Sequence, residues 1–302
     1  MKLHHLRDFI AIAETRSVRG AARKLGLSQP ALTRSLQELE GELGTPLLER
    51  HARGVSLTAI GQAFFSRMHS AMEDIRRAQD EVAQLLGTQT GAVCVGLSSA
   101  VWLGMAAEVH TAFRKQYPGI RLRMVEGFFS TLEARLQDGT LDFCICPRPV
   151  RAIGDAYQIQ LLFQNERLVV CRKGHPMRAA KRLKELVDEE WILTGVRERV
   201  EAEFEELFSS HGLRTPVAMT QAESMVGVAV LLGSTDALAV LPRQWVNSPL
   251  LSHVIEAIPI KERIDGPDIV QISRAGVPLT PAAQHFATLF ERAAGHYAAR
   301  SK

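Results

Sequence analysis

The chain has 302 residues, of which 46% are hydrophobic and 23% charged, and its formal net charge is +3. This length has room for about two domains with a sizeable core, and no stretch approaches the roughly 18 uninterrupted apolar residues of a membrane-spanning helix. The balanced charge excludes a strongly basic protein that coats nucleic acid. Because the N-terminus also lacks the apolar core of a signal peptide, we expect a cytoplasmic protein without a membrane partner.

Residues 1–60 carry the whole basic excess, with nine Lys and Arg against six acidic residues. Apolar residues at helical spacing predict a first helix over residues 3–14. A second short helix, residues 18–25, begins after the N-cap Ser17 and ends at Gly26, and a third begins directly after Ser28, which is also a good N-cap. The packed face of the third helix consists of leucines at helical spacing: Leu32, Leu36, Leu39 and Leu43. This pattern predicts a helix-turn-helix that the first helix supports from behind.

The opposite face of the third helix is polar. Its side chains can hydrogen-bond base edges and phosphates in a major groove, and they are Gln29, Thr33, Arg34 and Gln37. A basic loop then follows between two short apolar runs, which is typical of a two-stranded wing, and its Arg50 and Arg53 could reach a phosphate or a minor groove. An ordinary pair of antiparallel helices with a solvated polar side would give the same helical pattern.

Three stretches, residues 21–25, 27–34 and 43–50, resemble the signature of the LysR family of transcriptional regulators. The match is ungapped within each stretch. The resemblance implies double-stranded DNA and RNA polymerase as partners. The residues expected to contact DNA are Ser28, Gln29, Pro30, Thr33, Arg34, Gln37, Arg50 and Arg53.

The same resemblance implies an α/β protein with an all-α N-terminal part. A winged helix-turn-helix would occupy residues 1–58, a long linker helix residues 59–87, and a two-lobed, periplasmic-binding-protein-like effector domain residues 88–302. Lobe I would span about 92–163 and 268–302, and lobe II about 164–267.

Apolar residues in the linker segment alternate spacings of four and three over three heptads: Phe64, Met68, Ala71, Ile75, Ala78, Val82 and Leu85. An amphipathic helix lying on its own domain would show the same pattern, but a helix of about 28 residues is roughly 42 Å long and exceeds a small winged domain. We therefore expect dimerisation through this helix, which would place two recognition helices on one face and match an interrupted palindrome. The resemblance implies a dimer or a dimer of dimers, that is, a homotetramer.

Beyond the linker, short apolar runs alternate with amphipathic helices. The order strand, helix, strand, helix, strand over residues 92–145 predicts a parallel sheet with right-handed crossovers. Further short strands and helices follow, and a C-terminal helix is expected from Pro281 to about Ala299. Two α/β lobes joined by crossing strands suit this count of elements.

In open α/β sheets, ligands bind beyond the carboxyl ends of the strands, where helix N-termini offer unpaired N–H groups. Hydroxyl side chains follow three of the predicted strands, and aromatic, proline and polar residues nearby are possible walls. The expected effector-binding residues are Ser98, Ser99, Trp102, Phe128, Phe129, Ser130, Thr131, Pro147, Arg148, Thr194 and Gln221. Such a site suits a small anion, and the resemblance implies a carboxylate or a sulfonate. Serine and threonine at helix starts also occur simply as caps.

The sequence has no nucleophile elbow, phosphate loop, dinucleotide-binding turn or metal-binding helix motif. We therefore expect no catalytic residues, no metal site and no cofactor. Cys144 and Cys146 point to the same side of a predicted strand and could form a redox or metal pair, although their apolar neighbours favour buried thiols. A constitutive DNA-bending protein without an effector is the alternative function.

Overall fold

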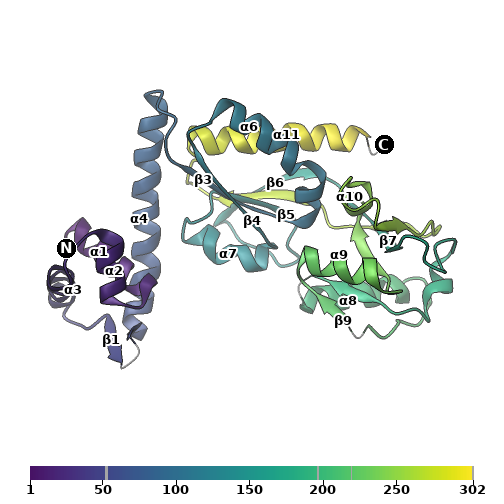
Figure 1. Ribbon diagram of the computed structural model, residues 1–302, viewed down its shortest axis with the longest axis horizontal. Coiled ribbons are helices and arrows are strands. Elements are labelled where there is room, and N and C mark those ends of the chain that lie inside the picture. Colours follow the sequence, from purple (N-terminus) through teal and green to yellow (C-terminus); the bar gives the residue numbers. More distant parts are fainter. Residues whose placement is uncertain (52–53, 196, 219, 301–302) are drawn as a thin grey trace. The chain divides into compact units, whose positions relative to one another are not determined.

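The computed structural model describes residues 1–51, 54–195, 197–218 and 220–300. The chain forms two compact units, which Figure 1 shows together with the order of the elements. The first, here called the N-terminal unit, consists of residues 1–88 and 134–140. The second, here called the C-terminal unit, contains the other described residues.

Three short helices and a hairpin begin the N-terminal unit: α1 (Leu3–Thr15), α2 (Val18–Leu25), α3 (Gln29–Leu43), β1 (Leu48–His51) and β2 (Gly54–Leu57). Phe9, Ile12 and three leucines of α3, namely Leu32, Leu36 and Leu39, contribute to its core. Leu43, which was predicted on the packed face, is 39% exposed because it lies at the last turn of the helix. The predicted caps are confirmed, since the hydroxyl of Ser17 accepts from Gly20 N–H and that of Ser28 from Ala31 N–H. Gly26 ends α2 with φ +67°, a conformation that glycine adopts without steric cost.

The hairpin β1–β2 is antiparallel and is held to the helices through backbone groups. A carboxylate oxygen of Glu40 on α3 accepts from the N–H groups of Leu47 and Leu48, at 2.7 and 3.2 Å. The backbone N–H of Val55 donates to the carbonyl oxygen of Arg16 at 3.1 Å. These bonds fix the hairpin beside α3, as expected for a wing.

The long helix α4 (Ala59–Leu85) starts at the N-cap Thr58, whose hydroxyl accepts from Gly61 N–H at 2.8 Å. Its heptad residues divide into two groups. Phe64 and Met68 pack against the core of the N-terminal unit. The five that follow are solvent-exposed: Ala71, Ile75, Ala78, Val82 and Leu85. The winged domain therefore covers only the first turns of α4, because the helix is longer than this domain.

The C-terminal unit contains a mixed five-stranded sheet in the order β4-β3-β5-β13-β6. The strands are β3 (Ala92–Leu97), β4 (Arg121–Glu126), β5 (Phe143–Pro147), β6 (Tyr157–Phe163) and β13 (Ile269–Arg274). The pairs β3–β4 and β3–β5 are parallel, as predicted, whereas β13 runs antiparallel to both β5 and β6.

Helices cover both faces of this sheet (Figure 1). On one face lie α6 (Ala107–Gln116) and α11 (Pro281–Arg300), whose Phe113 and Phe286 are fully buried with ring centroids 4.6 Å apart. On the other face lies α7 (Phe129–Gln137). A Cβ at Gly96 on β3 would stand 2.4 Å from Leu132 of α7, so the absence of a side chain allows this close packing.

The helical segment that follows β3, residues 99–116, is not uniform along its length. A short α5 (Ser99–Val101) leads into a π-helical segment η1 (Trp102–Ala106), which continues as α6. π-Helical turns are rare and concentrate at functional sites.

Residues 164–267 contain smaller sheets. Strand β7 (Glu166–Arg172) pairs antiparallel with β10 (Ala239–Pro242), β11 (Ile255–Ala257) and β12 (Ile264–Asp265), whereas β8 (Ile192–Thr194) and β9 (Thr220–Ala222) pair in parallel. The accompanying helices are η2 (Leu183–Leu186), α8 (Arg197–Ser209), α9 (Met225–Ser234) and α10 (Arg243–Asn247). Helix α10 and strands β11 and β12 were not predicted from the sequence, since two to five residues are too few to show a period.

Candidate functional site

The polar face of α3 is the first candidate site. Gln29, Pro30, Arg34 and Gln37 are exposed, and Thr33 is half-buried. Ser28 is exposed, but its hydroxyl already caps the helix. Arg50 on β1 is also exposed, whereas Arg53 lies outside the described residues. The expected DNA-contacting side chains on α3 therefore share one solvent-facing surface.

This surface presents donors and acceptors without acidic groups at the start of the helix. No acidic residue occupies the first turn of α3. The N-terminus of a helix carries a partial positive charge, so a phosphate near Ser28 and Gln29 would meet favourable N–H dipoles. Such a face can bind the anionic backbone of DNA and hydrogen-bond base edges.

A hollow of about 460 Å³ lies beside this surface, between α1 and α3. Its lining includes Arg34 and the buried His5. The His5 Nε2 lies 3.2 Å from a carboxylate oxygen of Glu38. The hollow beside the polar face of α3 is therefore lined by ionisable side chains from both α1 and α3.

The second candidate site is one edge of the five-stranded sheet. Because β3, β4 and β5 are parallel, their carboxyl ends meet there, at Leu97, Glu126 and Pro147. The predicted effector-binding turns follow these ends: Ser98–Ser99, Phe128–Thr131 and Pro147–Arg148. The edge thus carries hydroxyl, aromatic and cationic side chains from three connections.

Two polar atoms at this edge are buried without a partner among the described residues. They are the hydroxyl oxygen of Ser98 and the indole nitrogen of Trp102. Ser98 is 2% exposed, and its side chain does not cap α5. A buried donor that makes no hydrogen bond costs free energy, so these two groups favour a polar ligand or water.

Ser99, by contrast, has a hydrogen-bond partner on a distant element of the C-terminal unit. Its hydroxyl oxygen accepts from the indole N–H of Trp245 on α10 at 3.3 Å. Trp245 was not among the predicted site residues. A signal was present in the sequence, since Trp245 follows a short apolar run that ends at Pro242.

The turn before α7 has a more specific arrangement than predicted. The hydroxyl of Thr131 donates to the carbonyl oxygen of Phe128 at 2.9 Å and accepts from its N–H at 3.2 Å. Phe129 is 4% exposed and packs edge-on against Tyr157 with centroids 5.4 Å apart. Phe129 is therefore a core residue and not a wall, whereas Ser130 is exposed.

Phe128 faces Gly195, which follows β8. A Cβ built on Gly195, whose φ is +125°, would stand 3.8 Å from the tip of the Phe128 ring. The side-chain amide of Gln221 on β9 donates to the carbonyl oxygen of Gly195 at 2.9 Å. Phe128 and Gln221 are thus brought together at Gly195, which was not among the predicted site residues.

Thr194 has a different environment. It lines a cavity of about 30 Å³ together with Arg167 and Glu203, whose side chains pair at 2.7 Å. This volume accommodates about one water molecule and no organic anion.

Charged groups at the edge are mixed in sign. The Arg148 guanidinium lies 3.6 Å from a carboxylate oxygen of Asp268, which reduces its availability for an anion. Burial raises the pKa of the Glu126 carboxyl at the end of β4, and the backbone N–H of Met225 partly opposes that shift by donating to it. An anionic ligand there would therefore have to avoid Glu126 and compete with Asp268.

The cysteine pair is buried, as favoured from sequence. Cys144 and Cys146 are 0% exposed, and the pKa of the Cys144 thiol is raised by its hydrogen bond with Cys146 and by burial. Burial also raises the pKa of Cys171 to about 11. Among the described residues, no cluster of three or more His, Cys, Asp or Glu could hold a metal ion, and no helix is long and apolar enough to cross a membrane.

Comparison with known proteins gives two family matches. Residues 3–62 match the family described as bacterial regulatory helix-turn-helix protein, lysR family, and residues 87–295 match the LysR substrate binding domain. The HTH-type transcriptional regulator GbpR of Azospirillum brasilense is 29% identical over 246 residues, which are 80% of this chain and 72% of that protein. TdcA of Escherichia coli strain K12, also an HTH-type transcriptional regulator, is 25% identical over 87% of this chain and 84% of its own length.

Solved structures share the fold over nearly the whole chain. The crystal structure of CbnR, a LysR family transcriptional regulator, matches with a TM-score of 0.72 and 24% identity over 97% of this chain and 99% of that one. Full-length CbnR complexed with its target DNA matches with a TM-score of 0.70, again at 24% identity, over 97% and 100% of the two chains.

Proposed function

The chain belongs to the LysR family of transcriptional regulators, and we propose that it binds an interrupted palindrome as a dimer or dimer of dimers and responds to a small anion. The observation that carries the DNA-binding part is the exposed polar face of α3 at a capped helix N-terminus. In this proposal Gln29, Thr33, Arg34 and Gln37 read bases in the major groove. Arg50 and Arg53 bind phosphates from the wing.

The two halves of the palindrome require two recognition helices in fixed register. The exposed apolar residues of α4 supply a surface for a second copy, because a sustained heptad stripe packs best against another helix. CbnR, whose fold this chain shares, has been crystallised with its target DNA. A family role in transcription makes RNA polymerase a further partner in the proposal.

The effector site is proposed at the sheet edge formed by the carboxyl ends of β3, β4 and β5. In the proposal, residues 92–163 and 268–302 form lobe I and residues 164–267 form lobe II. The donors of Ser98 and Trp102, which have no partner within the described part of the chain, favour a ligand with acceptor oxygens. A carboxylate or a sulfonate supplies such oxygens, and Phe128 supplies an apolar wall.

The DNA-binding part is tested with purified full-length protein and the DNA upstream of its own gene. Replacement of Arg34 by Ala should weaken specific binding by about 1 to 3 kcal/mol, because one side chain that reads a base contributes this much discrimination. Binding to random DNA should change little. Replacement of Arg50 by Ala should instead weaken binding to every sequence and lower the salt dependence. Equal loss on specific and random DNA for Arg34→Ala would contradict base reading.

The effector part is tested by thermal unfolding of the full chain with benzoate, succinate and benzenesulfonate. A ligand at one hundred times its Kd should add about 2.7 kcal/mol to the free energy of unfolding. Arg50→Ala serves as the control, because it should respond as the wild type does. If none of the three compounds raises the unfolding temperature, the result would favour a constitutive regulator and would count against an anion site at this edge.

A further inference from the structure

Helix α4 buries one charged side chain, Arg77. It is 8% exposed, although Ile75 and Val82 nearby on the same helix are exposed at 37% and 58%. Removing a guanidinium from water is costly unless hydrogen bonds replace the water. Arg77 Nη2 donates to the carbonyl oxygen of Gly139, and Nη1 lies 3.6 Å from a carboxylate oxygen of Asp74. Gly139 belongs to the N-terminal unit, with residues 134–140.

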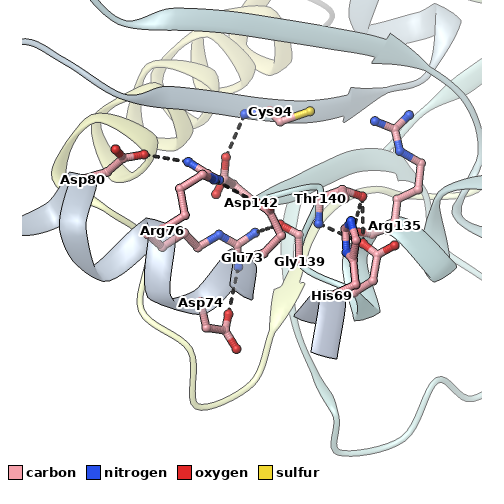
Figure 2. A network of polar contacts seen from close by, with 12 residues as sticks. His69, Glu73, Asp74, Arg76, Asp80, Cys94, Arg135, Gly139, Thr140 and Asp142 are labelled. Carbon is pink, nitrogen blue, oxygen red and sulfur yellow. Dashed lines mark hydrogen bonds and ion pairs between the residues drawn. The ribbon is translucent and has the colours of Figure 1, made fainter. Parts of the chain in front are cut away.

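The carbonyl oxygen of Gly139, which accepts from Arg77, lies in a turn that several hydrogen bonds stabilise. Gly139 has φ +81°, and the N–H of Asp138 donates to Ala134 at 2.9 Å, as at the end of a helix. Thr140 donates to a carboxylate oxygen of Asp138 from its N–H at 2.9 Å and from its hydroxyl at 2.7 Å. Figure 2 shows Gly139 and Thr140 in one polar network with the acidic residues of α4. The carbonyl that Arg77 binds is therefore held in a fixed position.

This turn directly follows α7, so the guanidinium binds at the C-terminal end of that helix. The C-terminus of a helix carries a partial negative charge, which a cation stabilises. The positive charge of Arg77 and its hydrogen bond to the carbonyl oxygen of Gly139 therefore both stabilise this contact. Asp74 on α4 itself also faces the guanidinium, which orients the side chain toward the turn.

The other end of α7 is the turn at Phe128, where Thr131 makes its two hydrogen bonds. In the proposed function this turn contacts the effector. A nine-residue helix is about 13 Å long and moves as a rigid body on this scale. The effector turn and the Arg77 contact therefore sit at opposite ends of one short rigid element.

Arg77 also lies away from the apolar stripe of α4. At 100° per residue, it points to a different face from Ile75, Ala78 and Val82. In the proposed function these three residues pack against the second copy. One helix would then contact the partner subunit with one face and the end of α7 with another.

We propose that Arg77 is a positioning residue that couples the effector-binding turn to the dimerisation helix through α7. The inference rests on the proposed function. A shift of α7 on effector binding would displace Gly139, and Arg77 would pass that displacement to α4. The angle between the two recognition helices, and with it the bend of the operator, would change as a result.

The test uses full-length protein with Arg77→Met, which keeps the length of the side chain and removes its charge. Arg77→Lys keeps the charge without the planar fork. The matched control is Arg67→Met, which removes the same charge from an exposed position of the same helix. Hydrogen exchange of residues 134–140 is measured without DNA, and the DNA bend angle and footprint are measured on the upstream DNA of the gene without effector.

In Arg77→Met, residues 134–140 should exchange about tenfold faster, since one hydrogen bond to a charged group is lost. Arg77→Lys should exchange at an intermediate rate, and Arg67→Met as the wild type does. The affinity of Arg77→Met for DNA should be retained, whereas its bend angle and footprint should differ from those of both wild type and Arg67→Met.

Two results would overturn the proposal. Unchanged exchange in Arg77→Met would mean that the contact with Gly139 is not made in solution. Faster exchange with an unchanged bend angle and footprint would mean that Arg77 has a structural role only. If the wild type fails to bind the upstream DNA at all, the proposed function itself is refuted, and the exchange data still report separately on the contact.

Discussion

At the scale of single residues, two adjacent serines at the sheet edge have opposite environments. Ser99 accepts from Trp245, whereas the buried hydroxyl of Ser98 has no partner among the described residues. Ser99→Ala leaves the buried indole N–H of Trp245 unpaired, which should lower the free energy of unfolding by about 1 to 3 kcal/mol. Ser98→Ala removes an unpaired polar group and should be neutral or slightly stabilising.

Urea denaturation without added ligand measures both serine variants under the same conditions. Trp245→Phe provides a double-mutant cycle with Ser99→Ala, and the coupling should be about 0.5 to 1.5 kcal/mol if the bond is made. A cost for Ser98→Ala as large as that for Ser99→Ala would show that the Ser98 hydroxyl binds something, such as an ordered water.

The thiols give a second prediction at this scale. With a pKa of about 11, only about one in a thousand Cys171 side chains is a thiolate at pH 8. Cys144 is fully buried, and its pKa is raised well above the ordinary value. Iodoacetamide at pH 8 should therefore modify the partly exposed Cys94 first, as followed by mass spectrometry. Early modification of Cys144 or Cys146 in the folded protein would instead support a reactive pair.

At the scale of elements, two glycines in the N-terminal unit should respond oppositely to the same change. A Cβ at Gly61 in α4 would stand 1.9 Å from the carbonyl oxygen of Leu47, whereas a Cβ at Gly41 in α3 would have no atom of a described residue within 4 Å. Gly61→Ala should lower the free energy of unfolding by about 1 to 3 kcal/mol, because the start of α4 must move away from the wing. Gly41→Ala should raise it by about 0.5 to 1 kcal/mol, since alanine favours the helix interior.

Thermal unfolding followed by circular dichroism measures both glycine variants, and each is the control for the other. A stable Gly61→Ala protein would mean that the contact between α4 and the wing is looser than the structure indicates. A destabilised Gly41→Ala protein would mean that the open side of α3 is covered, for example by a second copy.

The elements that sequence predicts well are those whose signals are local. The caps Ser17 and Ser28 and the turn at Gly26 are set by neighbouring residues, and the structure confirms them. The three parallel strands at the sheet edge are also as predicted, because the strand and helix periods alternate clearly. Strand β11, by contrast, has three residues and is defined by its pairing with β7, which no local pattern encodes.

The candidate effector site shows the same limit. The positions of Ser98, Ser99 and Phe128 follow from the ends of predicted strands, so the sequence places them at one edge. The roles of Phe129 and Thr194 depend on what packs beside them, namely Tyr157 for one and Arg167 with Glu203 for the other. Gly195 lies 67 residues after Phe128 and Trp245 lies 146 residues after Ser99 in the sequence, so only tertiary structure brings them there.

At the scale of the whole molecule, the division of the heptad residues of α4 decides how an assembly would form. Val82 and Leu85 are 58% and 72% exposed, which is unusual for apolar side chains at regular spacing on a long helix. If this stripe packs against a second copy, a charge in its middle must be desolvated and should break the pairing. Val82→Glu should therefore convert the protein to smaller species in sedimentation at micromolar concentration.

DNA binding should fall with the assembly, because two linked recognition helices bind two half-sites far more tightly than one. The loss on a full palindrome should be about a hundredfold or more, whereas binding to a single half-site should change little. Ser66→Glu is the matched control, since it adds the same charge to an exposed position outside the stripe. If Val82→Glu sediments as the wild type does, the stripe is not the dimer interface, and the second recognition helix must be positioned by another surface of the chain.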